Sequence, residues 1–189
     1  MIFATVGTQL PFDRLIQALD KWSLNQGVKG NFCQIGPAGT APLHMAHTPT
    51  LTPVQFAKRI AECKAIVSHA GMGTILTALQ AGKPIIILPR LARYGEHRND
   101  HQLATAANLQ GRAGIHVAGD EDTLAAMLDD IGALTAGGSL SDAAEPRLID
   151  AIRDFIAQPA IAQPSIVQPT IAQPGPTQNR ITKRETPNV

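Results

Sequence analysis

Short apolar segments alternate along most of this chain with segments that have the pattern of amphipathic helices, and this alternation restricts the fold more than any other feature. The strand-like segments cover residues 2–6, 31–35, 65–68, 85–88 and 115–117. The helix-like segments begin at Pro11, cover residues 52–62, 73–81 and 97–110, and begin again after Asp120. This alternation predicts an α/β, Rossmann-like domain with an open, mostly parallel sheet and helices on both faces. Ligands bind such sheets beyond the carboxyl ends of the strands, so we expect the chemistry in the loops after Val6, Ser68 and Leu88.

The last part of the 189-residue chain has a different composition. From residue 156 the pattern Ile-Ala-Gln-Pro recurs with small variations, which places prolines at positions 159, 164, 169 and 174. Prolines at this spacing exclude regular helix and sheet and favour an extended chain. We therefore predict one domain over residues 1–155 and a disordered Gln/Pro-rich repeat tail over residues 156–189. A weak docking peptide is the alternative for the tail.

Charge and composition limit the partners and the compartment. The formal net charge of +1 provides no field that would gather nucleic acid, so we expect no nucleic-acid partner and only local recognition of phosphate. Cys33 and Cys63 lack CxxC spacing, which favours free thiols in a reducing compartment. The sequence has neither the pattern of a secretory signal nor an apolar stretch long enough to span a membrane. A cytoplasmic location is expected, with any membrane contact made through a partner.

The strongest local motif is the segment Ser-His-Ala-Gly-Met-Gly-Thr at residues 68–74, between a predicted strand and a predicted helix. Two glycines allow close approach of the backbone to a ligand, and the free amides of the following helix favour an anion such as a pyrophosphate. A tight turn without a ligand is the alternative. A dinucleotide fingerprint would need glycine where Leu76 stands, and the only Gly-Lys pair, Gly82 and Lys83, is followed by Pro84. Nicotinamide enzymes and P-loop ATPases are thus disfavoured.

A dense polar stretch at residues 89–102, Pro-Arg-Leu-Ala-Arg-Tyr-Gly-Glu-His-Arg-Asn-Asp-His-Gln, follows the most apolar strand. It should lie at the same edge of the sheet as the glycine loop. His97 and His101 have the spacing of a metal pair on one helical face, with Asp100 nearby. Recognition of sugar hydroxyl groups fits the same side chains better, because no third ligand has a suitable spacing. A solvated helix start is the third possibility.

These motifs together resemble the C-terminal, donor-binding half of glycosyltransferase family 28, over residues 1 to about 134. The resemblance depends on Thr-Val-Gly-Thr at 5–8 followed by Phe-Asp at 12–13, on the glycine loop with Gly-Lys-Pro at 82–84, and on Asn-Asp-His-Gln at 99–102. It is greatest to small split members, namely the catalytic subunit of the dolichol-linked N-acetylglucosaminyltransferase and bacterial exopolysaccharide transferase subunits. The fold implied is the C-terminal half of a GT-B glycosyltransferase.

The resemblance also implies roles for individual residues. Gly7 and Thr8 would line the cleft near the diphosphate, the glycine loop would hold phosphate and nucleoside, and the 99–102 segment would meet the donor sugar. The implied catalytic residues are His69, Asp100 and His101. The expected substrate-binding residues are Gly7, Thr8, Gly71, Met72, Gly73, Thr74, Arg90, Asn99 and Gln102. No metal and no cofactor are expected. Related enzymes often have a ribose-binding Glu where this chain has Thr77.

The function implied is transfer of a hexose from a nucleotide-diphosphate sugar to a lipid-linked saccharide acceptor in exopolysaccharide biosynthesis. The donor would be a UDP-sugar, such as UDP-glucuronic acid, UDP-galactose, UDP-glucose or UDP-N-acetylglucosamine. Arg90, Arg93 and Arg98 could pair with the carboxylate of glucuronic acid. A membrane-associated, acceptor-binding subunit would recruit the chain to the inner face of the membrane. A sugar-nucleotide epimerase or hydrolase of the same fold, and a non-catalytic nucleotide-sugar-binding scaffold, are the alternatives.

Overall fold

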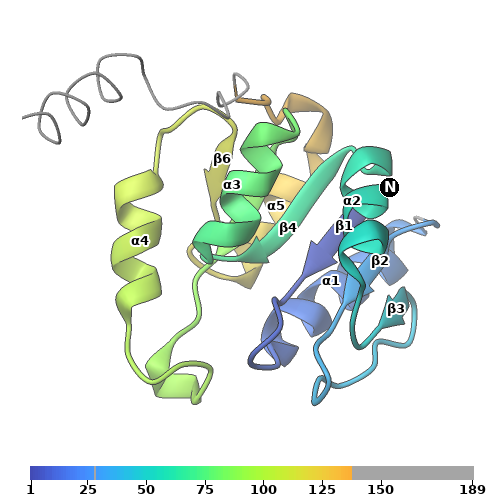
Figure 1. Ribbon diagram of the computed structural model, residues 1–189, viewed down its shortest axis with the longest axis horizontal. Helices are drawn as coiled ribbons and strands as arrows, with labels where there is room; N and C mark the ends of the chain where they lie inside the picture. The colour runs from blue at the N-terminus through green and yellow to red at the C-terminus, as the bar shows by residue number, and fades with distance from the viewer. Residues whose placement is uncertain (28, 138–189) are drawn as a thin grey trace, which may run out of the picture. The chain divides into compact units, whose positions relative to one another are not determined.

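The computed structural model describes residues 1–27 and 29–137. These residues form a six-stranded sheet in the order β3-β2-β1-β4-β5-β6, in which all neighbouring strands are parallel (Figure 1). The strands are β1 (Ile2–Thr5), β2 (Phe32–Gln34), β3 (Ala46–Thr48), β4 (Ala65–His69), β5 (Ile85–Leu88) and β6 (Ile115–Val117). The predicted α/β, Rossmann-like fold is confirmed, and the sheet is parallel throughout.

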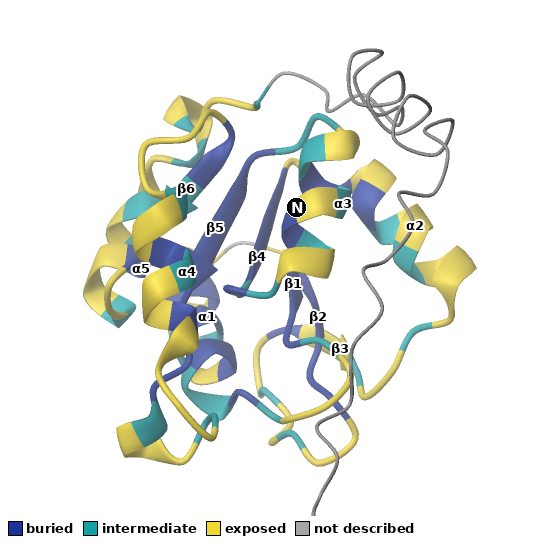
Figure 2. Ribbon diagram, turned by 60° about the vertical axis from the view of Figure 1, so that its left-hand side comes forward, coloured by how far each residue is buried: buried dark blue, intermediate teal, exposed yellow. Residues whose placement is uncertain are grey.

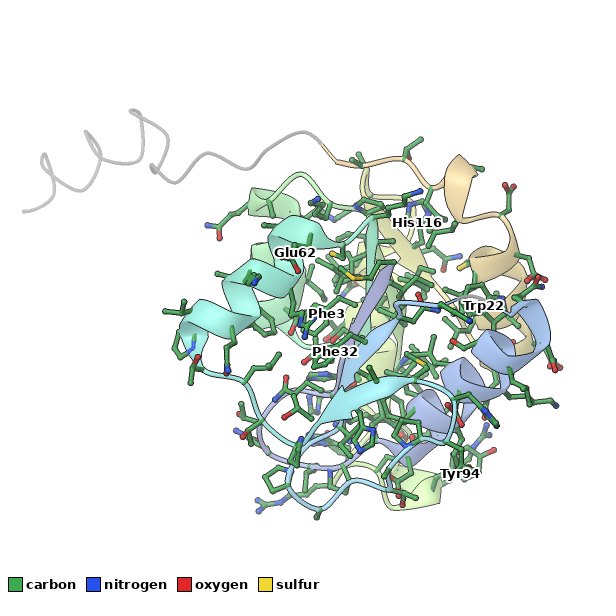
Figure 3. The ribbon with its side chains drawn as sticks, turned by 90° about the vertical axis from the view of Figure 1, so that its right-hand side faces the viewer. Phe3, Trp22, Phe32, Glu62, Tyr94 and His116 are labelled. Carbon is green, nitrogen blue, oxygen red and sulfur yellow. The ribbon has the colours of Figure 1, made fainter. Side chains whose placement is uncertain are left out.

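Helices cover both faces of this sheet. One face carries α1 (Asp13–Gln26) and α5 (Glu121–Asp129), and the other carries α2 (Pro53–Glu62), α3 (Met72–Gln80) and α4 (His101–Leu109). Two short 3-10 helices, η1 (Ala92–Tyr94) and η2 (Ile131–Ala133), follow β5 and α5. Figure 3 shows Trp22 of α1 on one side of the strands, and Phe3 and Phe32 on the other side, toward α2.

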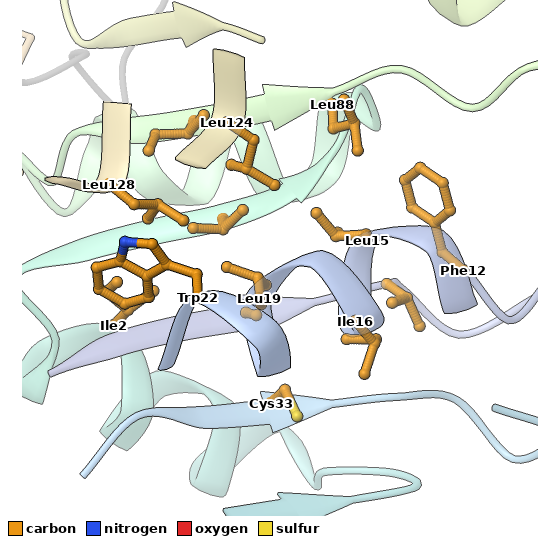
Figure 4. Close-up of a cluster of buried hydrophobic side chains, with 14 of the residues drawn as sticks. Ile2, Phe12, Leu15, Ile16, Leu19, Trp22, Cys33, Leu88, Leu124 and Leu128 are labelled. Atoms are coloured by element: carbon orange, nitrogen blue, oxygen red, sulfur yellow. The ribbon is translucent and has the colours of Figure 1, made fainter. Parts of the chain in front are cut away.

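Each face of the sheet has its own hydrophobic cluster, because successive side chains of a strand point to opposite faces. Ile86 belongs to the cluster beneath α1 and α5, whereas Ile85 and Ile87 belong to the cluster beneath α2, α3 and α4. Figure 4 shows the first cluster, where Leu15 and Leu19 of α1 lie near the strands. The central strands are buried on both sides, while the outer faces of the helices are exposed (Figure 2).

The helix ends predicted from the sequence are largely present. Thr52 caps α2 through a capping box with Gln55, and the Asp120 side chain accepts a hydrogen bond from the Thr123 amide at the start of α5. Gly82 follows α3 with a φ of 62°, the left-handed conformation expected of a glycine that ends a helix. These local signals fix where the helices begin and end, and therefore where the loops at the carboxyl edge of the sheet lie.

Two elements of the fold differ from the sequence prediction. The helix expected over residues 97–110 begins only at His101, because the amides of Leu91 and Ala92 donate to the side chains of Glu96 and Asp100 and hold the preceding residues in η1 and bends. Strand β3 was not predicted. It is an edge strand whose first two residues are exposed, so it lacks the apolar pattern of a buried strand.

Other sequence predictions concern residues elsewhere in the chain or properties of single side chains. The boundary at residue 155 and the repeat at residues 156–189 lie outside the described residues. Cys33 and Cys63 are both buried and free. Within residues 1–27 and 29–137, no helix has the length and apolar character that a membrane crossing requires.

Candidate functional site

A hollow of about 500 Å³ lies beyond the carboxyl ends of β1, β4 and β5. It is lined by the loop after β1, by the turn from β4 into α3, and by residues after β5 and in the first turns of α4. The lining residues are Val6, Gly7, Thr8, Gln9, Leu10, His69, Ala70, Gly71, Met72, Gly73, Thr74, Arg90, His97, His101, Gln102 and Thr105. The three loops expected from the sequence to carry chemistry thus meet in one place.

The position of this hollow follows from the topology of the sheet. After β1 the chain moves outward to β2 and β3, and then returns to form β4 on the other side of β1. The loops after β1 and β4 therefore leave toward opposite sides and open a crevice between them, the topological switch point where doubly wound sheets bind ligands. The hollow is at that point because Val6 to Leu10 follow β1 and Ala70 to Thr74 follow β4.

The N-terminus of α3 opens into the hollow. Gly71 is the N-cap of this helix, no side chain caps it, and no acidic residue lies in its first turn. The first amides of a helix have no intrahelical acceptor, so those of Met72, Gly73 and Thr74 are available to an anion, at the positive end of the helix dipole. The Gly71 amide differs from the sequence expectation, because it donates to the His69 carbonyl oxygen at 2.7 Å.

His69 lies between two glycines at the bottom of this crevice. A Cβ atom at Gly7 would be 2.9 Å from Cε1 of the His69 ring, and a Cβ atom at Gly71 would be 2.2 Å from its Nε2. Gly7 also has a φ of +79°, which side chains rarely adopt. The two glycines are therefore required by the ring between them, which the sequence motif alone does not reveal.

The charge state of His69 follows from its surroundings. Burial, together with the charges of the nearby Arg90 and His97, lowers the pKa of His69 to about 4, against a hydrogen bond with the Thr5 backbone that raises it. The imidazole is therefore neutral at pH 7. Its Nδ1 lies 3.3 Å from the Ser68 hydroxyl oxygen. A neutral ring of this kind can exchange a hydrogen bond with a ligand in the hollow without adding charge.

Arg90 is placed differently from the role suggested by the sequence. Its side chain is buried, and its terminal nitrogens donate to the carbonyl oxygens of Val6, Leu10, Pro11 and Glu96. Its own amide donates to the Gln102 side chain at 3.1 Å. Burial lowers the pKa of Arg90 and the attraction of Glu96 partly offsets this, which leaves the pKa at about 10, so the guanidinium is charged at neutral pH. Its hydrogen bonds go to the protein backbone, not outward to a sugar carboxylate.

His97 and His101 meet in the hollow although they do not share a helix. Their ring centroids are 4.3 Å apart in an edge-to-face arrangement, and the Nδ1 atom of His97 is buried without a hydrogen-bond partner among the described residues. Asn99 accepts from His101 through both the backbone amide and the ring, and Asp100 accepts from the Ala92 amide at 2.8 Å. Asn99 and Asp100 do not line the hollow, unlike the other predicted site residues.

The lining has a consistent electrostatic character. The described residues of the lining include Arg90, three histidines and the positive end of α3, but no aspartate or glutamate. Within the described part of the chain, no group of three or more His, Cys, Asp or Glu side chains is arranged to hold a metal ion. The arrangement suits an anionic ligand that carries hydroxyl groups, since the polar side chains of Thr8, Gln9 and Thr105 complete the wall.

Sequence reasoning left Gln9, His97 and Thr105 out of the predicted site. Thr105 follows His101 by one helical turn, a spacing that places both on the same face of α4 and could have found it. His97 was considered as half of a metal pair and as a partner for sugar hydroxyl groups, but it was not included among the predicted site residues. Gln9 belongs to the loop after β1, where no motif singles out one residue.

A second, larger hollow of about 720 Å³ lies between α1 and η1. Three of its charged groups, Arg14, Glu96 and Glu121, are already paired with each other. Arg14 binds the Glu96 carboxylate at 2.7 Å and 2.9 Å and the Glu121 carboxylate at 3.2 Å. The smaller hollow has the uncapped helix and the unpartnered His97 nitrogen, so it is the better candidate for a ligand site.

A parallel sheet with a hollow at its topological switch point is typical of Rossmann-like domains. The model of the glycosyltransferase family 28 C-terminal domain matches residues 1–132. The chain therefore belongs to this family, and the predicted resemblance is confirmed. No match is found among curated protein sequences.

Solved structures agree on the fold. The NMR solution structure of ALG13 matches with a TM-score of 0.52 at 17% identity, over 80% of this chain and 93% of that one. CalG4, the calicheamicin glycosyltransferase, matches with a TM-score of 0.51 at 14% identity, over 82% of this chain and 43% of that one. The chain also spans 35% of the glycotransferase of kitacinnamycin. It thus has the Rossmann-like fold found in GT-B glycosyltransferases, and spans less than half the length of CalG4.

Proposed function

We propose that this chain is the donor-binding catalytic subunit of a two-subunit hexosyltransferase that uses a UDP-sugar. The observation that carries the proposal is the uncapped N-terminus of α3, which opens into a hollow whose described lining residues include Arg90, histidines and hydroxyl-bearing side chains but no carboxylate. A diphosphate matches the free amides, and a hexose matches the histidine, glutamine and threonine side chains around them.

The chemistry proposed for this donor-binding subunit is stabilisation of the leaving nucleoside diphosphate. Negative charge grows on the diphosphate as the bond to the sugar breaks, and we assign its stabilisation to the amides of Met72, Gly73 and Thr74 at the start of α3. His69 lies beside them as a neutral hydrogen-bonding group, and His101 and Gln102 are the groups proposed to contact the sugar. Asp100 would have to leave the Ala92 amide to take the catalytic role suggested by family resemblance.

The placement of three arginines bears on which hexose we propose. An acidic donor was suggested by Arg90, Arg93 and Arg98, but the guanidinium of Arg90 binds backbone carbonyls and the other two arginines do not line the hollow. Galactose, glucose and N-acetylglucosamine therefore come before glucuronic acid among the donors that we propose. Ribose recognition is assigned to hydroxyl and amide side chains of the lining, because Thr77 donates to the Gly73 carbonyl oxygen and carries no carboxylate.

The acceptor side is proposed to come from a second protein. The chain spans 43% of CalG4, whereas it spans 93% of ALG13. We propose a membrane-associated subunit that presents a lipid-linked saccharide on the cytoplasmic face of the membrane, in exopolysaccharide biosynthesis. The chain itself would then bind the donor and depend on that subunit for transfer.

Calorimetry with the full chain tests donor binding. UDP and a panel of UDP-galactose, UDP-glucose, UDP-N-acetylglucosamine and UDP-glucuronic acid are titrated, with ADP-glucose as the control for the base. Saturable binding of UDP and of one UDP-sugar is expected. Absence of binding for the whole panel contradicts the proposal, and equal affinity for neutral and acidic sugars removes any role for a sugar carboxylate.

A product assay separates transfer from the alternatives. The isolated chain is incubated with the UDP-sugar that binds, and the products are analysed by chromatography. We expect the donor to be stable until the partner subunit and a lipid-linked acceptor are added. Conversion of the donor to an epimer, or its hydrolysis at a catalytic rate by the chain alone, would instead identify an epimerase or hydrolase.

A further inference from the structure

Arg90 is a buried cation whose partners are all backbone carbonyls. Its exposed fraction is 2%, and its terminal nitrogens donate to Val6 at 2.9 Å, to Leu10 at 2.8 Å, to Pro11, and to Glu96 at 3.3 Å. Among the described residues, no carboxylate lies within ion-pair distance of its guanidinium. A buried charge usually has an ionic partner, so its absence here needs an explanation.

The carbonyls that bind Arg90 belong mainly to one loop. Val6, Leu10 and Pro11 are in the segment that connects β1 to α1, and the residues of this segment from Val6 to Leu10 line the hollow. A planar guanidinium with its donors in a fixed fork can bind several carbonyls at once, so Arg90, which itself lines the hollow, holds this loop in place. The ring of Phe12 adds to this, because its centroid lies 4.6 Å from the guanidinium carbon.

The nearby Glu96 does not neutralise Arg90 directly. Its carboxylate accepts two hydrogen bonds from Arg14 and one from the Leu91 amide, while only its backbone carbonyl contacts Arg90. One carboxylate therefore ties α1 to the segment after β5, and the positive charge of Arg90 stays directed at the loop and the hollow.

We propose that Arg90 is a positioning residue of the donor site: it holds the loop from Val6 to Pro11 in its ligand-binding shape, and the diphosphate of the donor supplies its missing counter-charge. This inference rests on the proposed function and deepens it. Arg90 acts through the loop and through its field across the hollow, and its hydrogen bonds with the carbonyls remain intact when the donor is bound. A lysine cannot replace it, because a single ammonium group cannot span the same carbonyls.

The test uses the full chain with Arg90→Lys and Arg90→Gln, and Arg93→Lys as the matched control. Arg93 is exposed, with its guanidinium carbon 4.9 Å from the Tyr94 ring centroid, and it does not line the hollow. Amide hydrogen exchange of residues 6–11 is measured without ligand, and UDP affinity is measured by calorimetry at two salt concentrations.

The expected results differ between the variants. Arg90→Lys cannot span the carbonyls, so we expect faster exchange in residues 6–11 and UDP binding weakened by about tenfold or more. Because this variant keeps the charge, the salt dependence of UDP binding should be kept. Arg90→Gln should lose both the affinity and much of its salt dependence. Arg93→Lys should change neither. Wild-type exchange rates in residues 6–11 together with wild-type UDP affinity in Arg90→Lys would overturn the proposal.

A measurement on the wild type keeps the proposal testable if the Arg90 variants do not fold. In NMR spectra of the guanidinium groups, the terminal N–H protons of Arg90 should exchange slowly and should shift when UDP is added. Those of Arg93 should exchange rapidly and remain unshifted. Equal exchange for both arginines would contradict the loop-holding role. Failure of the wild type to bind any nucleotide sugar would instead contradict the proposed function, while slow exchange of Arg90 would still be measurable without ligand.

Discussion

His69 and its two flanking glycines show how closely the residues of this site depend on each other. The ring occupies the space that a side chain would need at Gly7 or at Gly71, and both glycines lie where a strand passes into a loop. A methyl group at either position would push the imidazole into the hollow or the backbone away from it. Glycine at these positions is therefore a packing requirement of a neighbouring residue as well as a conformational one.

Gly71→Ala should displace the His69 ring, whereas Gly73→Ala should not. The Cβ atom at Gly71 would be 2.2 Å from His69 Nε2, and the Cβ atom at Gly73 would meet nothing within 4 Å. We expect Gly71→Ala to lower the free energy of unfolding by about 1–3 kcal/mol, as overpacking does, and to shift the imidazole resonances of His69. Urea denaturation and NMR measure both effects. Equal stability of the two variants would show that the ring moves freely.

Burial of His69 should also make stability depend on pH. Its folded pKa is about 4 and the unfolded value is about 6.5, so at intermediate pH the unfolded state binds the additional proton. This contribution is therefore present above pH 6.5 and is lost as the pH falls toward 4, with a slope approaching about 1.4 kcal/mol per pH unit. Urea denaturation of the wild type and His69→Gln over this range measures the difference. Parallel pH profiles would contradict a neutral, buried His69.

Some residues of the site could be predicted from the sequence, and others could not. Gly71 and Gly73 are predictable because glycines between a strand and a helix have a local physical reason. The placement of Arg90 was not predictable, since three of its four carbonyl partners lie 79 to 84 positions away in the sequence and only the folded sheet brings them together. Asp100 likewise turns to the Ala92 amide, a choice set by the η1 turn and not by any motif.

Among the elements, α3 is the one whose end carries the proposed binding function. The helix has no N-terminal cap, and its N-cap Gly71 is extended, with φ of −95° and ψ of 124°. An uncapped helix end lacks the stabilisation that α2 gains from Thr52 and α5 from Asp120. The absence is understandable if a ligand supplies the missing acceptor.

Met72→Pro tests this with little disturbance of the helix. Proline is favoured at the first helical position, and the extended Gly71 before it is compatible with proline, so α3 should still form. Proline removes one amide, so we expect UDP binding to weaken by about 1.5–3 kcal/mol, roughly tenfold or more, measured by calorimetry. Met72→Ala removes the same exposed side chain but keeps the amide, and should bind UDP normally. Equal affinity of both variants would exclude this amide from the site.

The elements themselves were predictable where local signals agree with tertiary packing. The apolar run of β5 predicts a buried strand, and the capping residues of α2 and α5 predict where these helices begin. The fold agrees with both. The start of α4 and the presence of β3 were not predictable. The first depends on side chains that bind the backbone several residues earlier, and the second on an exposed edge strand placed by its neighbour.

At the scale of the whole molecule, the family match and the site occupy the first two thirds of the chain. The match ends at residue 132, and the residues that line the hollow lie between Val6 and Thr105. The alternation of strands and helices, and hence the class of fold, could be predicted from the sequence alone. The strand order, which places the hollow, depends on long-range pairing that no local pattern encodes.

Removal of residues 156–189 should leave the donor site intact. The described residues that line the hollow lie between Val6 and Thr105, so we expect unchanged UDP affinity and an unchanged thermal midpoint when the repeat is removed. Calorimetry and thermal denaturation of the shortened and full chains measure the two quantities. A marked loss of affinity would mean that the repeat takes part in donor binding, and a lower midpoint would mean that it contributes to the folded domain.

The switch point between β1 and β4 has a consequence for motion. The two loops that flank it lead into chain stretches on opposite sides of the switch point. The loop after β1 continues to α1, β2 and β3, and the loop after β4 continues to α3 and β5. A ligand bound across both of these segments holds them together. Local opening of either chain stretch then requires release of the same ligand. Saturating nucleotide should therefore slow solvent exchange in β2 and in β5 together, although these strands do not touch.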